Sequence, residues 1–151
     1  MLKAEKDFEE FIELLNKHKV EYMIVGAYAL ALYTKPRNTG DIDIFIGRFE
    51  NNADLMLQVL KEFGFESAEI TKNDFLTEGK IIQLGVSPVR IDVMSSIDGV
   101  LFEKAYQRVE KVRFGYTIAN FISREDLIKN KSSCKRKKDL ADLEELQSAN
   151  D

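Results

Sequence analysis

Apolar side chains recur at two different spacings along the chain, and the spacing separates helices from strands. Over residues 5–17, phenylalanine, isoleucine and leucine side chains lie three or four positions apart, which is typical of an amphipathic helix. Short apolar or alternating runs predict strands over residues 21–25, 41–46, 66–70, 80–84, 89–94 and 116–121. Residues 105–112 fit either a helix or a strand.

Composition and capping residues predict the other helices of the first half. Residues 27–33 are rich in alanine and leucine, which favour a helix. A further helix, capped at or near Asn52, should run to residue 63, where Gly64 can close it. Residues 34–40 are polar, contain a proline and a glycine, and predict a loop.

The C-terminal quarter of the chain predicts two helices. Ser123 followed by Asp126 three residues later resembles a capping box that opens a helix over residues 124–130. The last helix is expected over residues 135–148, and its apolar side comprises Leu140, Leu143 and Leu146. The whole order of elements predicts an α+β fold, a mixed β-sheet with helices packed on it.

Length and charge limit the class of protein. The 151 residues carry 22 Lys and Arg against 26 Asp and Glu, and the formal net charge is −4. The length favours one minimal domain over residues 1–151, with the helices from about residue 124 packed on its core. The acidic total argues against a protein whose whole surface binds nucleic acid.

Nothing in the sequence predicts a membrane or an oxidising environment. The long uncharged segment over residues 22–33 is too short to cross a bilayer, and the first residues are charged. A single cysteine, Cys134, cannot form an internal disulfide or a zinc cluster. We therefore expect a soluble cytoplasmic protein that does not bind membranes.

The segment Gly40-Asp41-Ile42-Asp43-Ile44-Phe45-Ile46 carries the sharpest chemical signal. On a strand, Asp41 and Asp43 project to the same side. Two adjacent carboxylates repel each other unless a proton or a cation lies between them. Carboxylate oxygens suit Mg²⁺ or Mn²⁺, so the pair predicts a site for such a metal.

Asp92 interrupts a second apolar strand and is a third candidate ligand. If its strand pairs beside that of Asp41 and Asp43, three carboxylates converge, which suffices for the two-metal arrangement used in displacement at phosphorus. Two alternatives remain at this point. Acidic residues also lie on solvated sheet edges, and glycosyltransferases use an Asp-x-Asp pair to hold the metal of a nucleotide-sugar.

Gly26 and Ala27 stand where a predicted strand passes into a helix. Glycine lets a phosphate approach the backbone, and the N-terminus of a helix offers free N–H groups and a positive dipole. A phosphate site is one interpretation of this segment, and a simple turn is the other.

Six basic residues and no acidic one lie between Lys129 and Lys138. Lys135 with Asp139 and Lys138 with Asp142 could form pairs four residues apart on a solvated helix, but such pairs contribute only about 0.2–0.5 kcal/mol each. Contact with phosphate or RNA is the other interpretation of this basic segment.

Taken together, these motifs resemble those of the DNA polymerase β-like nucleotidyltransferase superfamily. The resemblance rests on Val25-Gly26-Ala27, Asp41-Ile42-Asp43 and Asp92, and spans residues 20–146. It is strongest to the small stand-alone prokaryotic members of the abortive-infection and toxin–antitoxin type. Those share the run from Arg37 to Asp43, a late lysine (Lys131) and the motif Arg136-Lys137-Lys138-Asp139-Leu140-Ala141-Asp142-Leu143.

The resemblance implies an activity and a role for each motif. A nucleoside monophosphate would pass from an NTP such as ATP to an acceptor hydroxyl, with release of pyrophosphate. Asp41, Asp43 and Asp92 would be catalytic and would hold Mg²⁺ or Mn²⁺. The nucleotide would bind Gly26, Ala27, Arg37, Lys131, Lys135, Arg136 and Lys138.

The partners are less determined. The acceptor implied by the resemblance is an RNA, a protein or a small molecule, and a partner protein or a homo-oligomer would supply acceptor recognition. Ala27 departs from the family pattern, because many active members have glycine or serine there and Ala27 offers only its backbone N–H. The alternative function is a catalytically silent nucleotide-binding or protein-interaction module of a two-component system.

Overall fold

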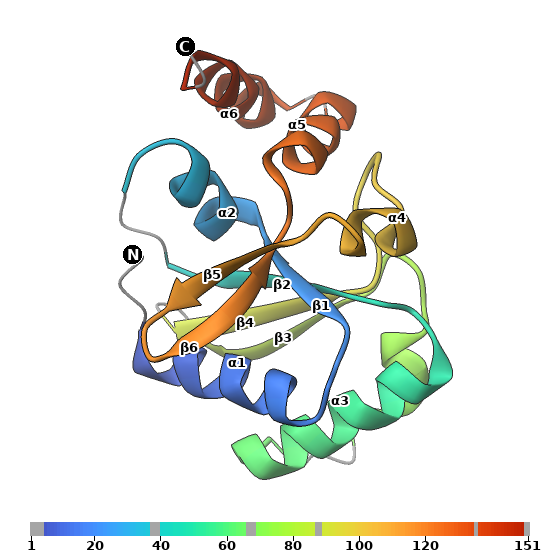
Figure 1. The fold of residues 1–151 in the computed structure, drawn as a ribbon. Helices are drawn as coiled ribbons and strands as arrows, with labels where there is room; N and C mark the ends of the chain where they lie inside the picture. Colours follow the sequence, from blue (N-terminus) through green and yellow to red (C-terminus); the bar gives the residue numbers. More distant parts are fainter. Residues whose placement is uncertain (1–4, 37–39, 66–68, 87–88, 135, 150–151) are drawn as a thin grey trace.

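A six-stranded mixed β-sheet forms the centre of the computed structural model, which describes residues 5–36, 40–65, 69–86, 89–134 and 136–149 (Figure 1). The strands are β1 (Tyr22–Val25), β2 (Ile42–Ile46), β3 (Ile81–Val86), β4 (Val89–Met94), β5 (Glu110–Phe114) and β6 (Thr117–Phe121). Their order across the sheet is β3-β4-β2-β1-β6-β5. β2 pairs with β4 and β1 with β6 in parallel, whereas the other neighbours are antiparallel. The predicted α+β fold with a mixed sheet is confirmed.

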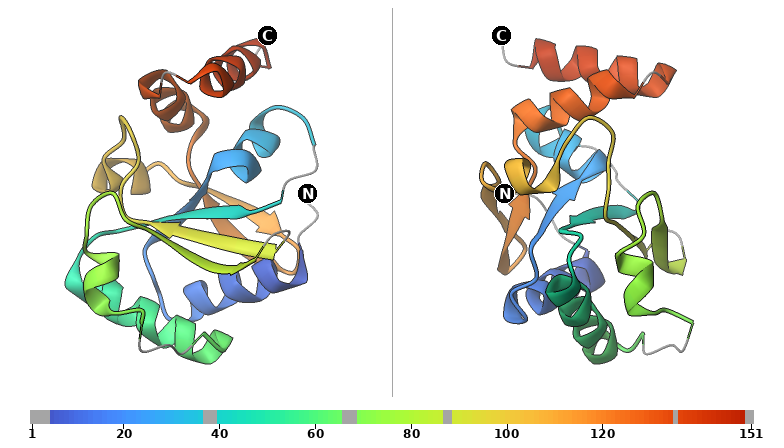
Figure 2. Two further views of the ribbon diagram at one scale, coloured as in Figure 1. Left: turned by 180° about the vertical axis from the view of Figure 1, so that it is seen from behind. Right: turned by 90° about the vertical axis from the view of Figure 1, so that its right-hand side faces the viewer.

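Helices cover both faces of this sheet. They are α1 (Lys6–Lys17), α2 (Gly26–Tyr33), α3 (Glu50–Phe63), α4 (Phe102–Tyr106), α5 (Arg124–Ser133) and α6 (Lys137–Ser148), with the 3₁₀ turn η1 (Lys72–Phe75). α1 and α3 lie on one side, and α2, α4 and the α5–α6 pair lie on the other (Figure 2). In the described parts of the chain, no helix has both the length and the apolar character required to span a bilayer.

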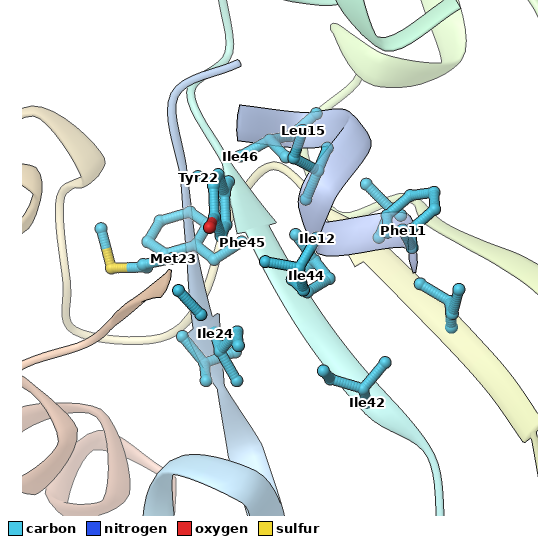
Figure 3. Close-up of a cluster of buried hydrophobic side chains, with 14 of the residues drawn as sticks. Phe11, Ile12, Leu15, Tyr22, Met23, Ile24, Ile42, Ile44, Phe45 and Ile46 are labelled. Atoms are coloured by element: carbon cyan, nitrogen blue, oxygen red, sulfur yellow. The ribbon is translucent and has the colours of Figure 1, made fainter. Parts of the chain in front are cut away.

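Alternation along β2 divides its side chains between the two faces. Ile44 and Ile46, which are fully buried, lie toward Ile12 and Leu15 of α1 (Figure 3). Phe45 points to the opposite face, where its ring meets that of Phe102 edge-on. Each such buried side chain contributes about 1.5–3 kcal/mol, so β2 is held firmly in its register.

Local hydrogen bonds overturn one predicted strand. Residues 66–68 of the predicted strand 66–70 lie outside the described residues, but Glu69 and Ile70 are not in a strand. Thr71 and Asp74 instead form a capping box that opens the turn η1. Side-chain bonds of this kind compete with strand pairing.

Two predictions about caps are confirmed and one is wrong. Gly64 ends α3 in the left-handed conformation (φ 97°), and the Ser123 side chain accepts the backbone N–H of Asp126. Asn52 does not cap α3, which begins at Glu50. Its buried side chain bonds instead to the backbone of Glu21 and Gly47, so it ties α3 to the ends of β1 and β2.

The undecided segment 105–112 contains both kinds of structure. α4 ends at Tyr106, and β5 begins at Glu110. Neither single assignment would have described it.

The inward face of α6 differs from the prediction. Leu146 is buried, but Leu140 is 55% exposed, while Asp139 and Asp142 are buried. Burying two carboxylates requires compensating positive charge. That charge lies at the candidate site.

Candidate active site

Two neighbouring parallel strands bring the acidic residues together. Asp43 on β2 is the direct partner of Asp92 on β4 in the parallel register, so both side chains lie on the same face. Asp41 stands immediately before β2, and its carboxylate shares one guanidinium with that of Asp92. The predicted convergence of the three carboxylates is therefore found in the structure.

The start of α2 lies against this acidic cluster. β1 runs antiparallel to β2 with Val25 opposite Asp43, so the chain enters α2 beside the Asp43 carboxylate. Gly26 has φ +68°, and a Cβ atom there would lie 2.1 Å from Asp43 Oδ2. Only glycine combines this backbone conformation with this close approach. Val25, the N-cap residue of α2, makes no side-chain capping bond in the described structure.

A cavity of about 660 Å³ opens between the sheet, α2 and the α5–α6 pair. It is lined by Gly26, Ala27, Leu30, Gly40, Asp41, Asp43, Arg90, Asp92, Lys131, Arg136, Lys138 and Asp142. This set includes eight of the ten predicted site residues. The other two, Arg37 and Lys135, lie outside the described residues.

The carboxylates oppose one another electrostatically. Burial and the negative charges of Asp92 and Asp41 raise the pKa of Asp43 from 3.8 to about 6, although Lys131 and Arg90 act in the other direction. The carboxyl group of Asp43 thus lies in surroundings that disfavour its charged form. A group whose ionisation is opposed in this way gains from a further cation.

Arg90 is a site residue that the sequence reasoning missed. Its Nε lies 2.8 Å from Asp92 Oδ1, and its Nη2 lies 3.0 Å from Asp92 Oδ2 and 2.9 Å from Asp41 Oδ2. Its place in the sequence could have identified it, because Arg90 is two residues before Asp92 on one strand and its side chain therefore lies on the same face.

The donor set suits a hard divalent cation such as Mg²⁺ or Mn²⁺. Asp41, Asp43 and Asp92 provide carboxylate oxygens at one cavity, and burial together with the charges of Asp92 and Asp41 raises the pKa of Asp43. Among the described residues, however, no three His, Cys, Asp or Glu side chains are arranged as a metal site. Two of these three carboxylates instead bind Arg90.

A second charged network joins α5 to α6 at the cavity wall. Lys131 is only 7% exposed, and its Nζ lies 3.4 Å from Asp139 Oδ1 and 3.2 Å from Asp142 Oδ2. Arg136 reaches the same Asp139 with both Nε (2.7 Å) and Nη2 (3.1 Å). The hydrogen bond from Arg136 keeps the pKa of Asp139 below its ordinary value.

The sequence did not lead us to expect Asp139 and Asp142 as site residues. The sequence reasoning paired them with Lys135 and Lys138 on a solvated helix face. Their spacing from Leu143 and Leu146 was the usable signal, because positions three, four and seven apart share one side of a helix. The acids in fact begin the inward face of α6.

Comparisons with known proteins give a matching family and a solved structure of similar fold. A family model described as a nucleotidyltransferase of unknown function (DUF6036) matches residues 4–150. The crystal structure of the lincosamide antibiotic adenylyltransferase LnuA, lincomycin-bound, is similar in fold, with a TM-score of 0.55 and 16% sequence identity. The similarity covers 97% of this chain and 98% of that one. A search of curated proteins finds no match.

Proposed function

Because the chain belongs to the nucleotidyltransferase family DUF6036, we propose that it transfers a nucleoside monophosphate from an NTP to an acceptor hydroxyl and releases pyrophosphate. One observation carries this proposal. Asp43 and Asp92 face the same cavity from adjacent parallel strands, next to the N-terminus of α2. Acidic side chains and the N-terminal end of a helix thus line one pocket, which supports binding of a metal and of phosphate there.

Mg²⁺ or Mn²⁺ would be held by Asp41, Asp43 and Asp92. The resemblance of their motifs to those of polymerase β-like enzymes supports these roles. The metal, when bound, neutralises charge on the phosphates and on the attacking oxygen. Asp92 also helps to take the proton from the acceptor hydroxyl.

The nucleotide phosphates are bound by the backbone and by cations. The first N–H groups of α2, at Gly26 and Ala27, point to the cavity end of the helix, where an anion is favoured. Arg136 and Lys138 are exposed at the cavity, and Lys131 contributes its charge from the wall. Arg37 and Lys135 stay predictions for the same role.

We assign to residues 1–151 a single minimal nucleotidyltransferase domain, whose acceptor is an RNA, a protein or a small molecule. LnuA is an antibiotic adenylyltransferase, which supports a small molecule as the first class to test. A partner protein or a second copy of the chain would present a larger acceptor.

The proposal is tested by transfer of label from each of four α-³²P NTPs with Mg²⁺, to RNA, protein and small-molecule hydroxyl acceptors. Wild type should transfer label to one acceptor class, and Asp43→Asn should not. Asp54→Asn removes an exposed carboxylate of α3 outside the cavity and serves as the matched control. Equal labelling by wild type and Asp43→Asn would refute the catalytic roles.

One observation favours the alternative, a nucleotide-binding module without catalysis. Arg90 already neutralises Asp41 and Asp92 in part. Such a module would bind NTP, as measured by calorimetry, but would transfer no label to any acceptor.

A further inference from the structure

Arg90 is held by two of the three carboxylates that the proposed function assigns to the metal. Its side chain is 29% exposed, and those of Asp41 and Asp92 are 25% and 11% exposed. The contact to Asp92 is bidentate, with two parallel N–H···O bonds. Paired geometry of this kind makes charge-assisted bonds strong and directional.

The same guanidinium also joins two segments of the chain. Nη2 donates to Oδ2 of Asp92 on β4 and lies equally near Oδ2 of Asp41, just before β2. Asp41 and Asp92 both line the cavity, and carboxylate oxygens are the ligands that a divalent cation shared by these residues would use.

We propose that Arg90 is an internal counter-ion that competes with the divalent cation for Asp41 and Asp92. A guanidinium and a metal ion bound to the same two carboxylates would repel each other. Each would also occupy oxygen atoms that the other needs for its own bonds. Metal binding therefore includes the cost of releasing Arg90. The inference rests on the proposed metal role of the three acids.

Competition makes a prediction that a merely structural ion pair does not. Removing the guanidinium should increase affinity for the metal, because a coupling between two ligands of one site is lost. A purely structural Arg90 would do the reverse, since its loss would disorder the carboxylates and weaken binding.

The experiment measures Mn²⁺ binding by the full-length chain without nucleotide, from the EPR signal of free Mn²⁺. Wild type, Arg90→Gln and Arg90→Lys are compared, with Asp43→Asn as the variant that lacks a ligand. Arg90→Gln should bind Mn²⁺ about tenfold more tightly than wild type. Arg90→Lys should lie between them, because lysine retains the charge without the bidentate geometry.

Arg108→Gln is the matched control. Arg108 makes the same bidentate contact with Asp126, at 3.1 and 2.8 Å, and neither residue lines the active-site cavity. Its Mn²⁺ affinity should equal that of wild type. Thermal unfolding in EDTA and in Mn²⁺ is a second measurement, which also reports whether each variant is folded. Mn²⁺ should raise the Tm of Arg90→Gln more than that of wild type.

The outcomes separate this inference from the proposed function. Equal or weaker Mn²⁺ binding by folded Arg90→Gln, with binding abolished in Asp43→Asn, would overturn the competition but leave the metal site intact. Absence of Mn²⁺ binding in wild type and Arg90→Gln alike would overturn both.

Discussion

Asp43 and Gly26 occupy adjoining positions in the site, and each limits what the other position can hold. Gly26 leaves room for the Asp43 carboxylate, whose Oδ2 would otherwise meet a Cβ atom at 2.1 Å. Asp43 in turn lies among Asp92 and Asp41, and ionises with difficulty. Both constraints arise from single atoms, and each can be tested by a single substitution.

Substituting Asp43 by asparagine should stabilise the protein above pH 7. The folded pKa of Asp43 is about 6, against 3.8 as the ordinary value, so the folded state binds this proton more tightly than the unfolded state. Stability from this group is therefore highest at low pH and falls as the pH rises from about 4 to about 6. Asparagine removes that penalty, which is on the order of 3 kcal/mol.

The measurement is urea unfolding in EDTA at several pH values between 4 and 8. The difference between Asp43→Asn and wild type should grow up to about pH 6 and then stay constant. Asp54→Asn controls for loss of a surface carboxylate. A difference that does not change with pH would contradict the argument.

Gly26→Ala should disable the site more than it destabilises the fold. The positive φ of +68° costs an alanine about 1–2 kcal/mol, and the Asp43 carboxylate must also rotate away. Gly64→Ala is the matched control, because Gly64 has φ +97° but a Cβ atom there would meet none of the described neighbouring atoms within 4 Å. Urea unfolding should show similar losses, while only Gly26→Ala should lose Mn²⁺ binding. Retained binding would show that Asp43 does not need its observed orientation.

At the scale of elements, a network of charged side chains joins α5 to α6. Asp139 is fully buried and contacts both Lys131 of α5 and Arg136, the N-cap residue of α6. Asp142 gives Lys131 a second partner. The two helices are thus joined by a charged network, of which Lys131, Arg136 and Asp142 line the cavity.

Asp139→Asn should destabilise the protein by about 3 kcal/mol, because removal of one partner leaves buried positive charge incompletely compensated. Asp142→Asn should cost less, about 1 kcal/mol, since the described contacts of Asp142 are with Lys131, whereas Asp139 also binds Arg136. Chemical denaturation of both variants at pH 7 measures the difference. Equal costs for the two substitutions would argue that Asp139 has no special role.

At the scale of the whole molecule, the cavity joins parts that are distant in the sequence. The sheet supplies the acids, α2 supplies the helix end, and the α5–α6 pair supplies the cations above them. In Figure 1 the α5–α6 pair lies beyond α2 and outside the layer of helices that covers the sheet. A ligand that fills this cavity would contact all three parts.

Nucleotide binding should therefore slow hydrogen exchange at two separate places. With ATP and Mn²⁺, amides at the start of α2 and in the first turn of α6 should both become protected. The same experiment with Asp43→Asn should show weaker protection at both. Protection confined to α2 would indicate that the α5–α6 pair does not contact the nucleotide.

Much of the fold could be predicted because local patterns decide it. The period of the apolar residues identified α1, β2 and β4, and Gly64 and Ser123 act as the expected caps. The same reasoning failed at Asn52, and in the described part of segment 66–70. There, hydrogen bonds to particular neighbours outweighed the local tendency.

The sequence by itself determined which residues could carry the chemistry: three acids in apolar strands, a glycine before a helix and a late group of cations. Only the tertiary structure decided which of them meet, because the register of β2 with β4 sets Asp43 beside Asp92. It also decided that Arg90 of β4 contacts Asp41, just before β2, and that Asp139 of α6 contacts Lys131 of α5. Charge acts over distances in space, and a one-dimensional pattern carries spacing along the chain but not those distances.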